Sequence, residues 1–354
     1  MIYLDYQATT PLAPEAREAM LYWLGEAGFA NPHSPHRPGR AAAAAVAVAR
    51  ESVAGILPPG GRVTFTGGAT EAINLAIQGL RPRRIAVSAI EHAAVLDTAR
   101  ACGAVVDVLP VSAEGLVAAD AEIASGTDLV AVMQVNNEIG TVQPVAALAA
   151  RAHEAGALFL CDAVQGAGKM AAPEGADMVA ISAHKIYGPK GIGALWTRDG
   201  VSLNPLIHGG GQEGGLRSGT LSPALSAGFG VAAALCKDLW IKDGEHVEAL
   251  WQIARAILPH WTLNGSEVQR WHGNLNIRRD GLDVARLMSD CRDIAFSAGS
   301  ACASGSGRPS HVLTALGLSS TQAKNSIRLG FGRYTQSGEF AEALKRIDAA
   351  ADAQ

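Results

Sequence analysis

Short apolar segments alternate with helical segments over residues 62–197, and this alternation restricts the fold more than any other feature of the sequence. Strands that are apolar throughout are typical of a mostly parallel sheet covered by helices on both faces. The predicted strands are 62–66, 84–88, 104–109, 129–135, 157–161, 177–181 and 193–197, and the predicted helices among them are 70–78, 93–102 and 145–155. We therefore predict an α/β fold, in which ligands bind at the carboxyl ends of the strands.

The rest of the chain suggests a second, smaller unit. A chain of 354 residues is too long for one typical core. Further helices are predicted at 14–27, 40–56, 223–240, 246–258, 284–290, 310–316 and 338–351, and further strands at 261–264, 274–278 and 326–330, while the proline-rich segment 29–39 is expected to be irregular. We predict a large domain over residues 14–245 and a smaller α+β domain formed by residues 1–13 and 246–354.

Composition excludes several classes of protein. Hydrophobic residues make up 48% of the chain and charged residues 18%, which is typical of a soluble globular protein, and a net charge of −4 gives no basis for binding nucleic acid. No apolar run reaches transmembrane length, and residues 1–5 are not typical of a signal peptide. The five cysteines form no Cys-x-x-Cys pair, which argues against a zinc ribbon or a disulfide framework. We expect a cytoplasmic protein that has no metal site and that binds neither a membrane nor nucleic acid.

A lysine follows the predicted strand 177–181 in the segment Ser-Ala-His-Lys-Ile-Tyr-Gly-Pro-Lys-Gly-Ile-Gly, residues 182–193. Lysine is costly to bury, so a lysine at the end of a core strand needs a reason. One reason would be a Schiff base between Lys185 and an aldehyde cofactor, with Ser182 and His184 as hydrogen-bond donors to that cofactor. A surface lysine in a polar turn is the alternative for this segment alone.

Other predicted strands also end at residues that carry chemistry. Thr70 lies in a glycine-rich helix start that suits a phosphate, although it is also a good N-cap. His92 could stack on a flat ring or move a proton, and Asn137 could donate a hydrogen bond to a ring hydroxyl or a substrate carboxylate. Either residue could instead be an ordinary polar residue of a turn. Asp162 follows a buried strand and needs a partner, for which a protonated pyridine nitrogen would be suitable.

Three later segments add candidates with equally ordinary alternatives. The glycine-rich segment 208–220 could reach a phosphate in its own or a neighbouring subunit, or be a mobile surface connection. Small residues surround Cys302 in segment 297–310, as a reactive thiol needs, but a free surface thiol would look the same. Arg328 lies in a predicted strand and could bind a substrate carboxylate or form a structural ion pair.

Taken together, these segments resemble the pyridoxal-phosphate cysteine desulfurases of the NifS/IscS type, which are class V aminotransferases. The matches run in the family's order from Tyr3-Leu4-Asp5 and Ala8-Thr9-Thr10-Pro11 to Arg328 and the segment 332–335, over nearly the whole chain. Gly214 stands where the family usually has arginine. The resemblance implies PLP fold type I, with a mostly parallel seven-stranded sheet in the large domain, and a homodimer with active sites at the subunit interface.

The resemblance also implies roles for individual residues. Lys185 would be the Schiff-base lysine, His92 would stack on the ring and help in proton transfer, and Cys302 would attack the substrate sulfur. The cofactor pyridoxal 5'-phosphate would be bound by Ala69, Thr70, His92, Asn137, Asp162, Gln165, Ser182, His184, Lys185 and, from the other subunit, Thr220. The substrate would be bound by Asn31, Asn137 and Arg328.

The activity implied is conversion of L-cysteine to L-alanine and an enzyme-bound persulfide. The sulfur would pass to an acceptor or an iron–sulfur scaffold protein, for cluster assembly or for thiolation of transfer RNA. A selenocysteine lyase or another aminotransferase-like enzyme is the main alternative, and an aminotransferase would not need Cys302. A catalytically silent homologue is a further alternative. An NAD-binding protein is disfavoured because no Gly-x-Gly-x-x-Gly opens the first βα turn.

Overall fold

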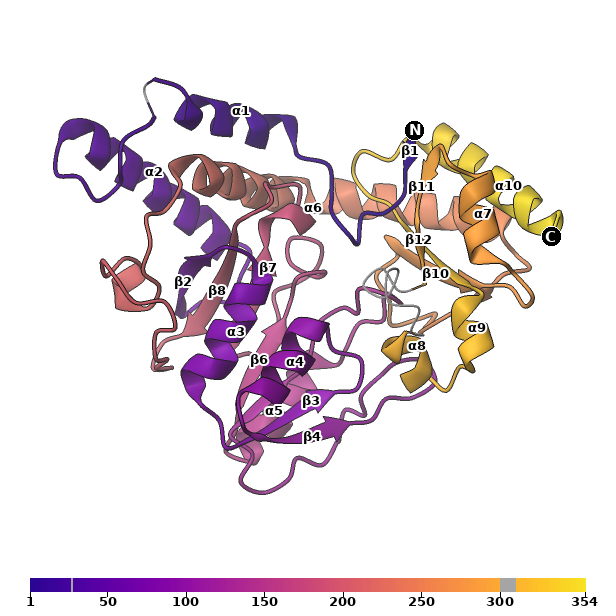
Figure 1. Cartoon of the computed structure of the whole chain (residues 1–354), viewed down its shortest axis with the longest axis horizontal. Coiled ribbons are helices and arrows are strands. Elements are labelled where there is room, and N and C mark those ends of the chain that lie inside the picture. The colour runs from indigo at the N-terminus through magenta and orange to yellow at the C-terminus, as the bar shows by residue number, and fades with distance from the viewer. Residues whose placement is uncertain (27, 300–309) are drawn as a thin grey trace.

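The computed structural model describes residues 1–26, 28–299 and 310–354, and its centre is a seven-stranded sheet (Figure 1). The strands in spatial order are β2 (Gly61–Thr66), β8 (Gly193–Arg198), β7 (Met178–Ser182), β6 (Leu158–Asp162), β5 (Leu129–Ala131), β3 (Arg84–Ser88) and β4 (Val105–Leu109). From β7 to β4 every pair is parallel, whereas β8 runs antiparallel to both of its neighbours. The predicted α/β fold with a mostly parallel seven-stranded sheet is confirmed.

Helices cover both faces of this sheet. One face carries α3 (Ala69–Leu80) and α4 (Ala93–Ala101), and the other carries α2 (Arg37–Ala54), α5 (Val145–Glu154) and α6 (Pro223–Ile257). Strand β6 shows why its sequence is apolar throughout: Phe159 and Cys161 face one layer of helices and Leu160 faces the other. Side chains that alternate between two buried faces leave no position for a polar residue until the strand ends.

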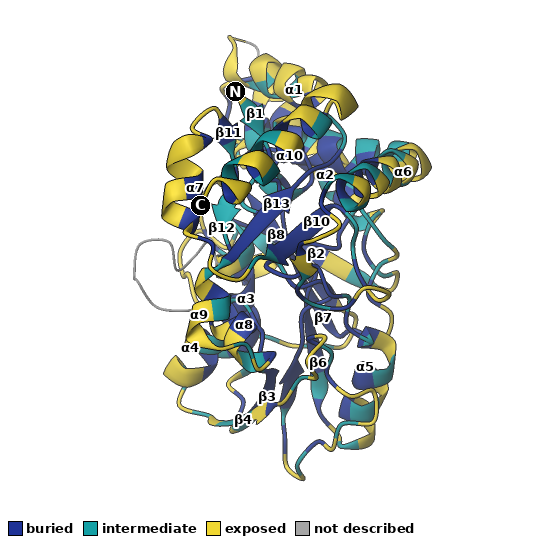
Figure 2. Cartoon of the chain, turned by 90° about the vertical axis from the view of Figure 1, so that its right-hand side faces the viewer, coloured by how far each residue is buried: buried dark blue, intermediate teal, exposed yellow. Residues whose placement is uncertain are grey.

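A smaller unit lies beside the sheet and contains both termini (Figure 1). Its antiparallel sheet has the order β12 (Ser297–Ala298), β13 (Ser326–Gly330), β10 (Asn274–Arg278) and β9 (Thr262–Leu263), and β1 (Ile2–Tyr3) pairs in parallel with β11 (Ile294–Ala295). The helices of this part are α7 (Val284–Asp290), α8 (His311–Ala315), α9 (Ser320–Lys324) and α10 (Ser337–Asp352). This unit buries an apolar core of its own, in which Leu4 packs with residues of α6, β10, β13 and α10. Strands β10 and β13 of this core are coloured as buried in Figure 2.

Helix α6 differs from the sequence prediction of two helices separated near residue 243. It continues through Gly244 because both of its halves are buried, the first against α1 (Pro14–Leu24) and α2, the second in the core of the smaller unit. Asp243, in its middle, is held by the guanidinium of Arg333 at 2.7 Å. Burial on both sides outweighs the cost of about 1 kcal/mol for one glycine in a helix. The predicted domain boundary at 245/246 falls inside α6 and stays a prediction.

Among the described residues, α6 is long and apolar enough by composition to cross a membrane, but its packing against α1 and α2 is that of a core helix.

The expectation that segment 29–39 is irregular is wrong at its end, because α2 begins at Arg37. Pro38 lies in the first turn, where its missing N–H has no helical partner to lose, and the His36 side chain accepts a hydrogen bond from Gly39 N.

Candidate active site

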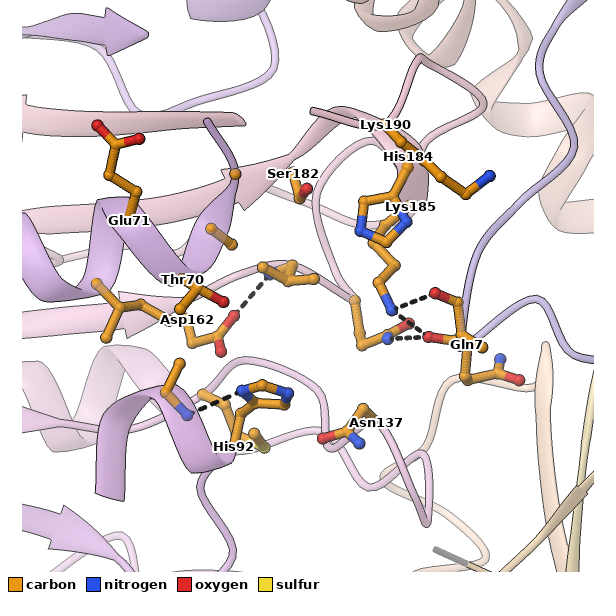
Figure 3. A pocket seen from close by; sticks show the side chains of 18 of the residues that line it. Gln7, Thr70, Glu71, His92, Asn137, Asp162, Ser182, His184, Lys185 and Lys190 are labelled. Carbon is orange, nitrogen blue, oxygen red and sulfur yellow. Dashed lines mark hydrogen bonds between the residues drawn. The ribbon is translucent and has the colours of Figure 1, made fainter. Parts of the chain in front are cut away.

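A cavity of about 950 Å³ lies where β3, β6 and β7 end (Figure 3). Parallel strands bring their carboxyl ends to one edge of a sheet, so polar residues far apart in the sequence meet there. The predicted site residues that line the cavity are Ala69, Thr70, His92, Asn137, Asp162, Gln165, Ser182, His184, Lys185 and Arg328. The structure therefore brings most of the predicted site together in a single chain, while the roles of these residues stay predictions.

Two predicted residues, Asn31 and Thr220, do not line this cavity. Asn31 is exposed, and its Oδ1 accepts a hydrogen bond from His33 N at 2.9 Å. Thr220 is also exposed, at the end of segment 208–220, where the prediction assigned it to the cavity of a partner subunit. Cys302 lies outside the described residues. The sequence prediction omitted Gln7, which lines the cavity. Its position between the two N-terminal segments that match the family could have pointed to it.

Lys185 ends a short helical turn that follows β7 directly. Its Nζ donates hydrogen bonds to the main-chain oxygens of Gln7 and, at 2.9 Å, of Ala8, and Gln165 Nε2 donates to the same Gln7 oxygen at 3.0 Å. The turn is fixed on its other side at Tyr187, which has a φ of 67° and whose N–H donates to Thr10 Oγ1. The N-terminal segment therefore holds the lysine amine inside the cavity.

Asp162 ends β6 and is buried, and within the described part of the chain its one hydrogen bond comes from Val164 N to its Oδ1 at 3.0 Å. Burial raises the pKa of this carboxyl above its ordinary value, and the charges of His92 and Lys185 oppose that shift. A buried carboxylate with so few donors needs a cationic partner. The protonated pyridine nitrogen of pyridoxal 5'-phosphate is such a partner, so Asp162 fits the cofactor that the sequence implies.

The other end of the cavity fits a phosphate group. Helix α3 begins there at Ala69 after Gly68, which gives no side-chain cap, so the first amides stay available to an anion. A Cβ on Gly193 would lie 2.7 Å from the carbonyl carbon of Gly68, so glycine is what lets β8 approach this turn. Burial and then the charges of Lys185 and Lys190 lower the pKa of His184 to about 4, which makes it a neutral donor at neutral pH.

Arg328, on β13, is both ion-paired and part of the cavity wall. Its guanidinium donates to Asp5 Oδ1 at 2.8 Å and to the main-chain oxygen of Asn137 at 3.1 Å, and the side chain is 1% exposed. Its Nε has no hydrogen-bond partner among the described residues. The two interpretations left open by the sequence, a structural ion pair and a carboxylate-binding residue, are therefore compatible in this geometry.

Glu91 is a buried acid directly before His92, and it predicts a pH dependence of stability. Its Oε1 accepts hydrogen bonds from Ser88 Oγ and Met133 N, and burial raises its pKa from 4.5 to about 8. The folded protein keeps a proton that an unfolded glutamate releases above pH 4.5, so unfolding releases a proton between these values. The free energy of unfolding therefore falls as the pH rises through this window, by up to about 1.4 kcal/mol per pH unit.

Glu91→Gln is expected to remove this contribution, because a carboxamide oxygen still accepts both hydrogen bonds and does not titrate. Urea unfolding of both proteins across the window measures the slope, with Glu51→Gln on the exposed side of α2 as the control that keeps it. If the free energy of unfolding had the same pH slope in Glu91→Gln and in the unchanged protein, that result would contradict the inference that Glu91 is protonated in the folded protein.

Comparison with known proteins shows to which family the chain belongs. A sequence model of the aminotransferase class-V family matches residues 2–342. The chain belongs to the class-V aminotransferase family. It is 41% identical to a protein named cysteine desulfurase IscS from Rickettsia bellii, over 98% of this chain and 90% of that relative. The predicted family is thereby confirmed, and pyridoxal 5'-phosphate is the cofactor of this family.

Solved structures agree with this family. A structure described as a NifS-like protein superposes with a TM-score of 0.91 at 30% identity and covers all of both chains. A second, described as SspA in complex with cysteine, has a TM-score of 0.84 at 36% identity and covers 95% of this chain and 100% of its own. The class-V fold is thus shared with proteins of known structure.

Proposed function

We propose that this protein is a pyridoxal-phosphate-dependent L-cysteine desulfurase. The observation that carries the proposal is the position of Lys185, Asp162 and Arg328 around one cavity, where they fit an aldehyde, a pyridine nitrogen and a carboxylate. The relative named cysteine desulfurase and the SspA structure in complex with cysteine support L-cysteine as the substrate. Once bound, the cofactor supplies an electron sink next to the substrate carbon.

The residues of the chain then have distinct tasks. Arg328 holds the substrate carboxylate, and Lys185 moves a proton at the carbon atoms of the substrate. Asp162 keeps the pyridine nitrogen protonated, and His92 lies against the ring. The thiolate of Cys302 attacks the substrate sulfur, so that a sulfur–sulfur bond forms as the carbon–sulfur bond breaks. That carbon takes up a proton, L-alanine leaves, and Cys302 keeps the sulfur as a persulfide.

The proposal extends to partners. In the proposed homodimer each subunit supplies Thr220, which is exposed in the single chain, to the cavity of the other. The persulfide passes to an acceptor or scaffold protein in the cytoplasm, for iron–sulfur cluster assembly or for thiolation of transfer RNA. Asn31 would then contribute to substrate binding in the assembled dimer.

A substrate comparison tests this function. We expect the purified protein to release L-alanine from L-cysteine without any keto acid, because the amino group never leaves the substrate. An aminotransferase would require the keto acid, and a selenocysteine lyase would turn over L-selenocysteine and leave L-cysteine unchanged. Either of these results would contradict the proposal.

A further inference from the structure

By sequence the glycine-rich segment 208–220 could reach a phosphate or be a mobile surface connection, and in the structure its side chains attach it to the large domain. Glu213, with a side chain that is 2% exposed, makes two hydrogen bonds of 2.7 Å to the Arg50 guanidinium. It also accepts a hydrogen bond from Phe65 N at the edge of the sheet. Leu216 is buried in the core beneath α3. These anchors fix where the next residue, Arg217, projects.

Arg217 is paired with Glu71 in the first turn of α3. Arg217 Nε donates to Glu71 Oε1 at 2.7 Å and Nη2 donates to Oε2 at 3.2 Å, with both side chains about three-quarters buried (20% and 26% exposed). This hydrogen bond raises the pKa of the Arg217 guanidinium above its ordinary value. The pair is therefore a fixed bidentate contact, in contrast to a loose surface pair.

Glu71 lies in the first turn of α3, where a negative charge is favoured by the helix dipole. It lines the cavity next to Thr70, in the helix start that fits the cofactor phosphate (Figure 3). Its Oε2 also accepts a hydrogen bond from Gly67 N at 2.7 Å, which fixes the turn before the helix. The carboxylate thus fixes the turn of the phosphate site but also places a negative charge at the same helix start as a phosphate that is itself negative.

We propose that Arg217 is a positioning residue for the cofactor, which neutralises Glu71 and so lets the start of α3 hold a phosphate. This inference rests on the proposed placement of the cofactor phosphate at α3. Without Arg217, the carboxylate of Glu71 repels the phosphate while the turn and its hydrogen bond stay in place. Removal of the Glu71 charge in the chain that lacks Arg217 then restores binding of the cofactor, although this second change leaves neither side chain of the original ion pair.

Titration of the cofactor-free protein with pyridoxal 5'-phosphate, followed by visible absorbance, tests this inference. We expect Arg217→Gln to raise the dissociation constant about tenfold, as an uncompensated charge several ångströms away predicts. Glu71→Gln in the same chain is expected to return it to near the original value, because the amide oxygen still accepts from Gly67 N. Arg217→Lys keeps the charge but loses the bidentate contact, and it is expected to bind the cofactor more tightly than Arg217→Gln does. Concentrated salt should reduce the defect of Arg217→Gln by screening.

The controls separate this inference from the placement on which it rests. Arg84→Gln breaks another arginine–carboxylate pair, with Asp107 at the far edge of the sheet, and is expected to bind the cofactor normally. If Arg217→Gln stays weak after Glu71→Gln is added, Arg217 acts through structure and the inference fails. If Arg217→Gln binds normally while Thr70→Ala binds weakly, the inference fails and the phosphate placement stands. If both variants bind normally, the placement itself is wrong.

Discussion

Replacement of Lys185 by alanine is expected to abolish both turnover and the yellow colour of the lysine-bound cofactor. The hydrogen bonds of Nζ to the main chain of Gln7 and Ala8 place this amine in the cavity, on the turn that follows β7. We expect a loss of activity of at least about a thousandfold, because nucleophilic and proton-transfer functions are removed together. The readouts are the visible spectrum and reduction with borohydride, followed by mass analysis of the labelled peptide.

A second lysine of the cavity provides the matched control for this prediction. Lys190 also lines the cavity but is exposed at its rim. Lys190→Ala is expected to keep the reducible bond between lysine and cofactor. A protein with Lys185→Ala that still carried this bond at full occupancy would contradict the assignment of Lys185.

Replacement of Cys302 by alanine is expected to give the opposite combination, normal cofactor colour with no persulfide and no sulfide. The described residues that fit the cofactor, Lys185 and Asp162 among them, are unchanged in this variant, and Cys302 is assigned to the sulfur step alone. The thiolate accepts the sulfur, and no other group at the site is assigned that task, so turnover should fall by orders of magnitude.

Another cysteine of the chain serves as the control for Cys302. Cys102 is half-buried at the end of α4, and Cys102→Ala is expected to keep full turnover. Mass analysis of the protein after one exposure to L-cysteine should show an added sulfur atom in Cys102→Ala and none in Cys302→Ala. Normal sulfide release by Cys302→Ala would disprove the role of this thiol.

The sequence predicted the sheet and much of the cavity because both depend on local patterns. Asp162 is the last residue of β6, where the strand ends at the cavity, and Lys185 follows the end of β7 in the same way. Since parallel strands end at one edge, the order of the strands was not needed to expect that such residues would meet.

The contacts that the sequence did not predict join segments that are far apart in the chain. The pairs of Arg217 with Glu71 and of Arg328 with Asp5 depend on which elements pack together, and no local pattern contains that information. Helix α6 was divided in the prediction for a related reason. A glycine within a polar stretch looks like a helix end, and the continuous helix is stabilised by two separate cores that only the folded chain shows.

The most direct test of the proposed desulfurase function is to measure the L-alanine and sulfide formed from L-cysteine with an added thiol, together with the visible spectrum of the protein. The thiol reduces the persulfide and releases its sulfur as sulfide, so each substrate molecule should yield one of each product. We therefore predict equal amounts of alanine and sulfide from a yellow protein. A yellow protein that forms no alanine from L-cysteine would contradict the proposed function, while leaving the cofactor and the fold in place.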